Sequence, residues 1–312
     1  MNIKEKLKSN QNFMSAYSEF NRIKYSIATI ISPTLNTKMR YKSAFKKSLD
    51  LNNPVTLNEK VLWLKLNTYF NNPLIKQCAD KYKVRDYIKS IDCGEILNDL
   101  IAVYENADDI RLEDLPDQFA MKLNYGCGYN IIVSDKSKFD LNEAKKKIKK
   151  WMKSKYYLLY SEMQYKVEKQ YIIVEKYLKP ENGLLPEDYK FHCMNGKAEY
   201  VMICKERGKD FRPKIYYYDR DWNFLPFDQK VDPHLTKPKN LDKAFEYADK
   251  LSKPFPYVRT DLYIFDDSII FGELTFTPVG GYNTHITEDA LKLLGSKINL
   301  NYSITDYHFN SI

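Results

Sequence analysis

Two alternating segments near the C-terminus constrain this chain most strongly. Residues 257–265 and 269–276 alternate apolar and polar side chains, are rich in β-forming residues and are separated by a turn at 266–268. The pattern predicts a β-hairpin. Because the side chains of a strand alternate between its two faces, pairing of these strands would bring Asp261 and Glu273 together.

The polar face of this hairpin has the residue types of a Mg²⁺–phosphate site. Arg259 shares one face with Asp261, and Thr275 shares one face with Glu273. Carboxylate and hydroxyl oxygens are hard ligands that suit Mg²⁺, and an arginine can clamp phosphate oxygens. The alternative interpretation is a salt-bridged hairpin with half of its face in solvent, and spacing alone leaves both open.

The composition indicates a globular protein with one large or two modest domains. Of its 312 residues, 44% are hydrophobic and 29% charged, and the formal net charge is +8, which favours an anionic partner such as a nucleotide, an acidic glycan or a membrane surface. The basic helices carry no nucleic-acid module signature, so no nucleic acid is expected. Five scattered cysteines without CxxC spacing argue for a reducing compartment. No apolar run approaches membrane-spanning length, so we expect a cytoplasmic protein.

The first fifty residues are predicted to be helical and carry no recognisable chemistry. Helical spacing runs over residues 4–31 until Ser32-Pro33 breaks it, and residues 38–51 form a basic second segment. Residues 23–32 are apolar but short and lie among lysines. We expect them to pack on the core as a helix. Peripheral contact with an anionic membrane surface, at the inner face, is the alternative.

A glycine-containing loop is the second informative stretch. A strand carrying Lys122 runs into a loop with Gly126, Cys127 and Gly128, and a second strand at 130–133 leaves it. Glycines let backbone N–H groups approach phosphates closely, and the lysine can supply charge. A plain β-turn is the alternative. The loop matches neither the Walker A nor the Rossmann pattern.

Several further elements follow from local signals. Residues 171–178 form a buried-type strand that leads into a linker and could make the floor of an adenine pocket, with Glu175 accepting from an amine or hydroxyl. A capping box at 56–59 opens a helix, residues 80–88 form a helix with a solvated charged face, and 188–203 form a hairpin around an Asn-Gly turn. Residues 280–283, Gly-Gly-Tyr-Asn, are predicted to form a flexible loop. Dispersed histidines and the absence of GxSxG argue against a zinc site or a hydrolase triad.

The order of these pieces resembles the ATP-grasp superfamily. The pieces are Lys122 with its glycine loop, the strand at 174–178, Arg259-x-Asp261 and Glu273-x-Thr275. Within the superfamily the chain is similar to the TupA-like ATP-grasp family, named for teichuronopeptide biosynthesis in bacterial envelopes. The resemblance is carried by NPVTLNEKVLWLKL, DKYKVRDYI, LPDQFAMKLNYGCGYN, IIVEKYL, DYKFHCMNGK and VRTDLYIFDDSIIFGELTFTPVGG.

The resemblance implies a fold of the α+β or α/β class in which two α/β lobes clamp Mg·ATP. The domain boundaries that we expect are 1–50 for an N-terminal helical extension, 51–115 for the N-terminal part of the core, 116–172 for a lid subdomain with the glycine loop, and 173–312 for a C-terminal subdomain with the metal site.

The resemblance also implies roles for individual residues, with ATP and Mg²⁺ as cofactors. Lys190 and Arg259 would face the phosphates or an acyl phosphate, and Asp261 and Glu273 would hold Mg²⁺. Superfamily members usually have Asn where this chain has Thr275, whose hydroxyl can still ligate Mg²⁺. The nucleotide would be held by Lys122, Gly126, Cys127, Gly128, Glu175, Lys176, Tyr177, Leu178 and, by analogy only, Lys81.

The implied reaction is the joining of a carboxylate and an amine through an acyl phosphate. We expect an amino acid or small amine to be attached to an acidic sugar or polysaccharide precursor of the bacterial surface or capsule. A glycosyltransferase, an ATP-dependent sugar or amine kinase, and a non-catalytic binding protein are the alternatives. Retention of Lys122, Asp261 and Glu273 argues against the last, because clustered charges are costly to keep without a use.

Overall fold

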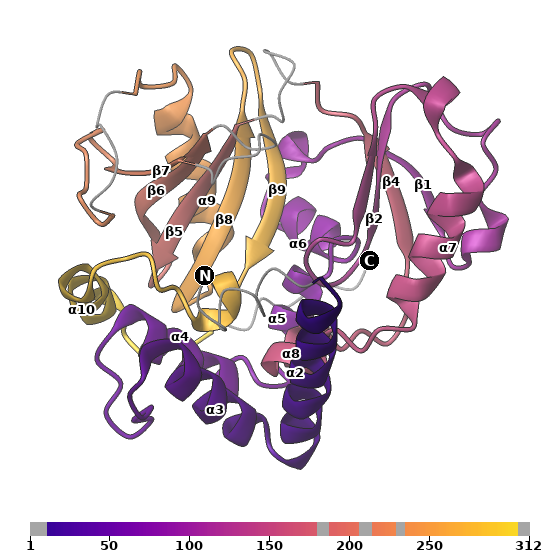
Figure 1. The fold of residues 1–312 in the computed structure, drawn as a ribbon. Helices are drawn as coiled ribbons and strands as arrows, with labels where there is room; N and C mark the ends of the chain where they lie inside the picture. Colours follow the sequence, from indigo (N-terminus) through magenta and orange to yellow (C-terminus); the bar gives the residue numbers. More distant parts are fainter. Residues whose placement is uncertain (1–10, 180–186, 206–213, 229–234, 305–312) are drawn as a thin grey trace, which may run out of the picture.

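Two antiparallel sheets form the centres of two lobes (Figure 1). The computed structural model describes residues 11–179, 187–205, 214–228 and 235–304. The smaller sheet has the strand order β1-β4-β2-β3 and the larger β7-β6-β5-β8-β9. Their bounds are β1 Leu100–Tyr104, β2 Phe119–Leu123, β3 Asn130–Val133, β4 Ile172–Lys176, β5 Asp188–Met194, β6 Lys197–Lys205, β7 Lys214–Asp219, β8 Tyr257–Ile264 and β9 Ile269–Thr275.

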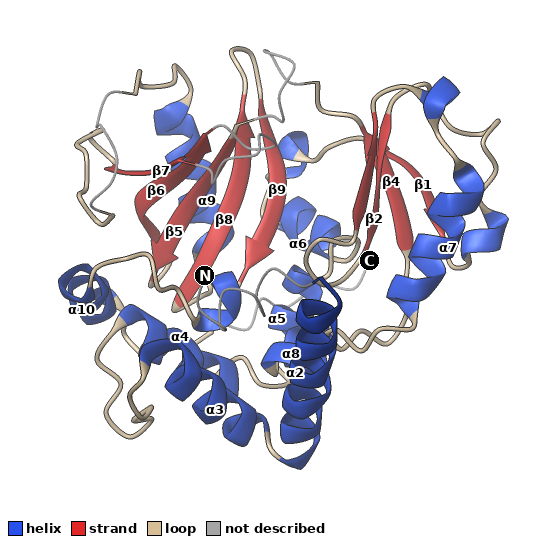
Figure 2. Ribbon diagram, viewed as in Figure 1, coloured by secondary structure: helices blue, strands red, loops and turns tan. Residues whose placement is uncertain are grey.

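Helices surround the two sheets and fill the space below and between them (Figure 2). Figure 2 shows α5 and α6 between the lobes and α3, α4 and α10 below the larger sheet. The helices are α2 Gln11–Ile31, α3 Pro33–Phe45, α4 Leu57–Leu66, α5 Pro73–Ala79, α6 Val84–Ser90, α7 Leu141–Met152, α8 Tyr157–Tyr160, α9 Leu241–Ser252 and α10 Glu288–Lys297. No helix in the described part of the chain is long and apolar enough to span a bilayer.

The larger sheet is covered by α9 on one face only. The ring of Phe245 on α9 meets the ring of Phe191 on β5 edge to face, with centroids 4.8 Å apart. Lys190 and His192 flank Phe191 in the strand and therefore point to the opposite face. The face opposite α9 carries polar side chains, and the candidate site lies on it.

The smaller sheet joins strands that are far apart in the sequence. β4 pairs antiparallel with both β1 and β2, so the strands at 100–104 and 172–176 belong to the same sheet as the strands around the glycine loop. Both expected domain boundaries, at 115/116 and 172/173, therefore cut through this sheet. Local sequence patterns predict each strand but not the distant strand with which it pairs, so the sequence could not show that these strands belong together.

Most local predictions are confirmed. Thr56 and Glu59 form the capping box at the start of α4, and Asn195 and Gly196 make the turn of the β5–β6 hairpin with φ of 50° and 79°. The helix predicted at 80–88 begins only at Val84, because the side chain of Asp80 accepts hydrogen bonds from the N–H groups of Tyr82 and Lys83 and holds this segment in a turn.

The segment predicted as a flexible loop at Gly280-Gly281 is a tight turn packed into the core. Both glycines have positive φ and are buried. A Cβ at Gly280 would lie 2.8 Å from the ring of Tyr160, and one at Gly281 would lie 2.6 Å from Leu62. The glycines therefore allow close packing here, and the flexible-loop prediction is wrong.

The N-terminal helices are attached to the segment where the chain leaves α7 for β4. The hydroxyl of Thr29 donates to the carbonyl of Leu158 at 2.6 Å. Arg40 donates to the carbonyl of Leu159 at 2.8 Å, and its guanidinium lies between the rings of Tyr25 and Tyr160, 3.8 and 4.0 Å from their centroids. The extension is thus part of the packed structure, but the isoleucines of residues 23–32, which were expected to pack on the core, are exposed.

Candidate active site between the lobes

Two rows of polar residues cross the face of the larger sheet that lies opposite α9. In the first row Lys190 on β5 lies opposite Asp261 on β8, which lies opposite Glu273 on β9. In the second row Arg259 is the central residue, between His192 on β5 and Thr275 on β9. The predicted hairpin is confirmed, and it brings the two carboxylates together.

Arg259 is the centre of the hydrogen bonds in this cluster. Its Nε donates to Oδ1 of Asp261 at 2.6 Å and its Nη2 to Oδ2 of the same carboxylate at 2.7 Å. Nη2 also lies 3.2 Å from Oε1 of Glu273 and 3.1 Å from Oγ1 of Thr275. A planar guanidinium that binds both oxygens of a carboxylate fixes the geometry of both groups.

Lys190 adds a second cation to the same carboxylate. Its Nζ lies 2.6 Å from Oδ2 of Asp261 and also contacts Asp188. Burial on its own lowers the pKa of Lys190, but the charge of Asp261 and then of Asp188 outweighs it, so the pKa is raised above its ordinary value. Lys190 is therefore a permanent positive charge in this site.

Lys81 connects this cluster to the glycine loop of the other lobe. Its Nζ lies 3.8 Å from Oε2 of Glu273 and donates to the carbonyl of Gly126 at 2.7 Å. Its backbone N–H donates to the carbonyl of Asn124 at 2.7 Å. Lys81, proposed by analogy only, thus lies where the polar face of the large sheet meets the loop.

The glycine loop has the backbone that its sequence predicts. Gly126 and Gly128 have φ of 74° and 77°, a region that L side chains rarely adopt. A Cβ at Gly128 would meet no atom within 4 Å, whereas one at Gly126 would lie 3.1 Å from the ring of Tyr156. Cys127 between them is exposed. Gly128 and Cys127 therefore form the open part of the loop.

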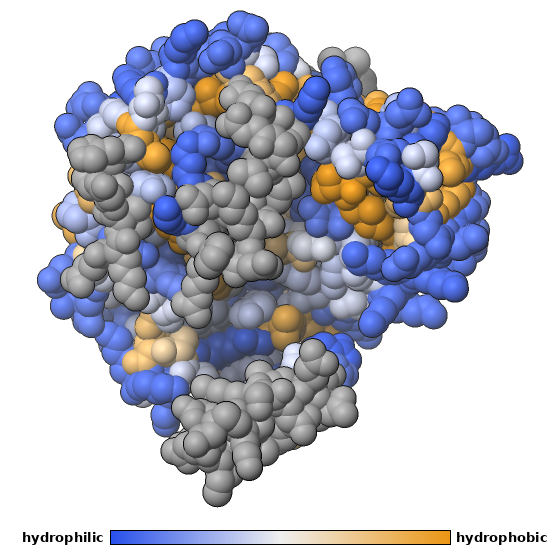
Figure 3. All heavy atoms as spheres, turned by 45° about the horizontal axis from the view of Figure 1, so that its top comes forward, coloured by the Kyte–Doolittle hydropathy of each residue, from blue (hydrophilic) through white to orange (hydrophobic). Residues whose placement is uncertain are grey.

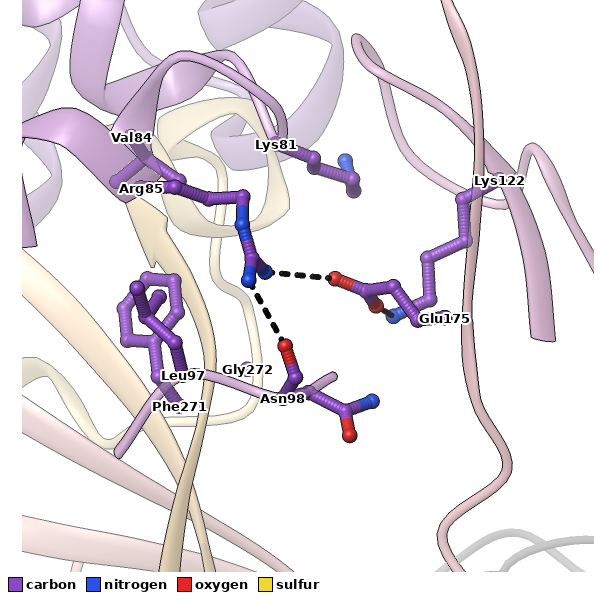
Figure 4. A pocket seen from close by; sticks show the side chains of 9 residues that line it. All are labelled: Lys81, Val84, Arg85, Leu97, Asn98, Lys122, Glu175, Phe271 and Gly272. Atoms are coloured by element: carbon purple, nitrogen blue, oxygen red, sulfur yellow. Dashed lines mark hydrogen bonds and ion pairs between the residues drawn. The ribbon is translucent and has the colours of Figure 1, made fainter. Parts of the chain in front are cut away.

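A narrow pocket lies between the lobes, where Lys122 of β2 and Glu175 of β4 face Arg85 of α6 (Figure 4). Lys122 Nζ is 2.8 Å from Oε2 of Glu175, and Arg85 Nη1 is 3.6 Å from Oε1. The open space in the pocket is about 10 Å³, room for roughly one water. Figure 3 shows the surface hollowed between the two lobes on the face that it draws. The pocket is filled by its own ion pairs.

Arg85 is a lining residue that the sequence analysis did not foresee. Arg85 was assigned to a solvated helix face, but its side chain is only 14% exposed and donates to the carbonyl of Asn98 at 3.0 Å. The local signal for this position is that Arg85 directly follows Val84, a buried residue, in the sequence. The contact with Glu175 is long-range, and nothing local in the sequence predicts it.

The residues that follow Glu175 lie differently. Lys176 is the next residue of β4, so its side chain points to the other face of the sheet, where it pairs with Asp99 at 3.2 Å. Neither Tyr177 nor Leu178 lines the narrow pocket. The linker expected to complete an adenine pocket includes residues 180–186, which lie outside the described part of the chain.

The oxygen donors present fit Mg²⁺. Asp261 and Glu273 lie in one cross-strand row, and the hydroxyl of Thr275 donates to Oε1 of Glu273 at 2.9 Å. Oxygens of all three residues contact Nη2 of Arg259, so three hard oxygen ligands lie around one point, which the guanidinium occupies in this structure. Among the described residues, no group of three or more His, Cys, Asp or Glu side chains gathers at one point. Asp261 and Glu273 would hold a Mg²⁺ ion that also needs oxygens from another source, such as phosphate.

His192 is a structural residue of this face. It is buried, its Nδ1 lies 2.8 Å from the hydroxyl of Tyr257, and its ring stacks on Tyr200 with centroids 4.5 Å apart. Burial first, and then the nearby charges of Arg259 and Lys190, lower the pKa of His192 well below its ordinary value. The imidazole is therefore neutral in the folded protein at pH 7.

Comparison with solved structures finds ATP-grasp ligases at low similarity. D-alanine–D-alanine ligase from Bacillus anthracis is 14% identical, with 78% of this chain and 65% of that chain covered and a TM-score of 0.43. An ADP complex of N5-carboxyaminoimidazole ribonucleotide synthetase is 13% identical, with 65% and 45% covered and a TM-score of 0.42. The chain thus spans less than two thirds of the length of either.

A search of curated proteins found no match. A comparison with sequence models of protein families did find one. The sequence model described as TupA-like ATPgrasp matches residues 59–299, which include both rows of the polar face, the glycine loop and the narrow pocket. The N-terminal extension lies before the matched range. The chain therefore belongs to the TupA-like ATP-grasp family.

Proposed function

We propose that this protein is an ATP-dependent ligase that joins a carboxylate to an amine through an acyl phosphate. The observation that carries the proposal is the cross-strand row Lys190–Asp261–Glu273 with Arg259 beside it, connected by Lys81 to the glycine loop. Cations and carboxylates that converge from two lobes match the needs of phosphoryl transfer, which depends on positioning and charge neutralisation.

Each part of the site has a role in this reaction. Lys122 and the loop at 126–128 would hold the phosphates of ATP, and Asp261 with Glu273 would hold Mg²⁺, which neutralises phosphate charge when bound. Arg259 and Lys190 would stabilise the oxygens of the γ-phosphoryl group as it passes to the substrate carboxylate. An amine then attacks the carbonyl carbon, phosphate leaves, and the amine gives up a proton to form the amide.

Binding of the nucleotide requires the narrow pocket to open. About 10 Å³ is far too small for a nucleotide. Lys122 and Glu175 come from one lobe, whereas Arg85 comes from α6, so separation of the lobes would break the Arg85–Glu175 pair and open the pocket, while Lys122 stays beside Glu175. Closure of the loop afterwards would exclude water and protect the acyl phosphate from hydrolysis.

We further propose an acidic sugar of a bacterial surface polysaccharide as the carboxylate and an amino acid or small amine as the nucleophile. The family description, TupA-like, supports this assignment. The cations of the site would also receive a sugar carboxylate, because Arg259 and Lys190 keep their charge at neutral pH.

The test is to measure phosphate release from ATP with uronic acids and amines, singly and together. A ligase releases ADP and phosphate only when both are present, and hydroxylamine in place of the amine traps a hydroxamate. A kinase instead yields a stable phosphorylated acceptor without an amine. If Mg·UDP-sugar raises the melting temperature and a Mg·ATP analogue does not, the ligase proposal is wrong and glycosyl transfer takes its place.

A further inference from the structure

The outward face of α2 is apolar, the reverse of the usual pattern for a helix that covers a protein core. Tyr25, Ala28 and Thr29 are buried against the rest of the molecule. The large apolar side chains lie on the other side, each between 49% and 70% exposed; they are Tyr17, Phe20, Ile23, Ile27, Ile30 and Ile31. A surface helix normally turns its apolar stripe inward.

Helical spacing shows that these side chains form one continuous strip. Phe20, Ile23, Ile27 and Ile30 follow one another at intervals of three, four and three residues, which places them on one side of an α-helix. We call Phe20, Ile23, Ile27, Ile30 and Ile31 the outer stripe. A contiguous exposed apolar surface of this kind marks an interaction site.

Almost all of the net positive charge of the chain lies in the same region. Residues 1–50 contain ten Lys and Arg against three Asp and Glu, so they carry +7 of the formal net charge of +8, and residues 51–312 carry +1. The charge that suggests an anionic partner is therefore concentrated in the extension, outside the family match at 59–299.

Among the described residues of this region, one lysine lies beside the outer stripe and two lie along α3. Lys24 is exposed on α2, four residues from Phe20 and three from Ile27. On α3 the exposed residues Leu35, Lys38 and Lys42 follow at intervals of three and four, which gives this helix a basic ridge. Lysine side chains can lay their aliphatic stems on an apolar surface and extend their charge to anions.

These features favour an anionic bilayer over a second copy of the chain. Pairing of two extensions would bring two regions of +7 together, which like-charge repulsion opposes. An anionic bilayer offers an apolar layer for the stripe and phosphates for the lysines at once. We propose that α2 and α3 bind the surface of an anionic lipid bilayer, with the outer stripe at the boundary of headgroups and acyl chains. This inference does not depend on the proposed ligase activity.

The test uses the full chain and sedimentation with vesicles of phosphatidylcholine alone or mixed with phosphatidylglycerol. We expect binding to the anionic vesicles only, weakened by high salt because the lysine contacts are screened. Ile27→Glu/Ile30→Glu should lower the partition coefficient by about tenfold or more, since both charges would enter the apolar layer. Leu293→Glu on α10, another exposed apolar residue, is the matched control and should bind as the wild type does.

A charge-reversal pair tests the electrostatic part. Lys38→Glu/Lys42→Glu should lower the partition coefficient by about tenfold or more, whereas Lys239→Glu/Lys243→Glu, exposed lysines at the same spacing elsewhere, should leave it unchanged. The proposal is overturned if neither vesicle binds the protein, if neutral vesicles bind it equally, or if both control variants lose binding to the same extent. It is likewise overturned if the wild type is a stable dimer that Ile27→Glu/Ile30→Glu converts to a monomer without any vesicle binding.

Discussion

Arg259 binds both carboxylate oxygens of Asp261, at 2.6 and 2.7 Å. Asp261 is 3% exposed, and its Oδ2 also accepts a hydrogen bond from Nζ of Lys190. A carboxylate that would hold a metal is therefore held by two cations of the same sheet. These ion pairs fix the orientation of the Asp261 carboxylate before any metal binds. A bound Mg²⁺ would share this carboxylate with Arg259. The predictions that follow test this arrangement and the packing that supports it.

Arg259→Lys should reduce turnover by about 100-fold, because an ammonium cannot reproduce the two parallel bonds to a carboxylate or clamp phosphate oxygens in the same way. Steady-state ADP release measures the loss. Arg220→Lys is the matched control, since Arg220 binds both oxygens of Asp249 at 2.7 Å away from the site. Equal losses of turnover in the two variants would mean that the substitution at Arg259 acts through folding and not through the active site.

Asp261→Asn and Glu273→Gln should each abolish metal-dependent turnover while the protein stays folded. The amides keep the size of the side chains but lose the charge that suits Mg²⁺. Circular dichroism and a Mg²⁺ titration of ADP release separate the two effects. Unfolded variants would support the other interpretation of the hairpin, in which the carboxylates serve only as ion-pair partners of Arg259.

Lys122→Met should weaken binding of an ATP analogue by about tenfold or more, because it removes a phosphate-facing charge. Lys176→Met should change the affinity little, since Lys176 points to the other face of the sheet and pairs with Asp99. Isothermal titration calorimetry measures both. Similar losses for the two lysines would mean that the narrow pocket is not where the phosphates bind.

Folding stability should fall as the pH drops from about 6.5 toward 5, through His192. Its pKa is lowered well below the ordinary value in the folded state, so the unfolded state binds more protons in this window. The stability from the neutral ring is fully present above the unfolded pKa of about 6.5 and is lost by up to about 1.4 kcal/mol per pH unit below it. His192→Gln should flatten this part of a urea-denaturation pH series. An unchanged slope would assign the pH dependence to other groups.

Gly295→Ala should destabilise the protein by about 2 kcal/mol or more. The added Cβ would lie 2.1 Å from the carbonyl oxygen of Val55, so α10 would have to move away from the start of α4. Gly94→Ala is the control, because its Cβ would meet its nearest atom at 3.6 Å. Urea denaturation measures both variants. A loss at Gly94 as large as that at Gly295 would contradict the steric explanation.

The sequence predicts best what depends on neighbours in the chain. The β8–β9 hairpin, the β5–β6 turn and the capping box at Thr56 follow from spacing and turn chemistry, and the facing of Asp261 and Glu273 follows from the hairpin. The pair Arg85–Glu175 is different, because it depends on how a helix and a sheet from separate parts of the chain come together. Strand alternation also shows why Glu175 and Lys176 cannot both face the pocket.

The role of the N-terminal extension could not be read from local patterns either. Its helices were predicted, but their partner is the backbone of Leu158 and Leu159, reached through Thr29 and Arg40. Those contacts join parts of the chain more than a hundred residues apart.

The contacts of Arg40 with the rings of Tyr25 and Tyr160 join the extension to the segment between α7 and β4. Leu158 and Leu159 lie between α7 and β4, where the chain returns to the small sheet. Thr29 and Arg40 hold this part of the chain to α2 and α3. If the lobes separate as proposed, an α2 held at a bilayer would therefore restrain the segment that joins the small lobe to the rest of the molecule.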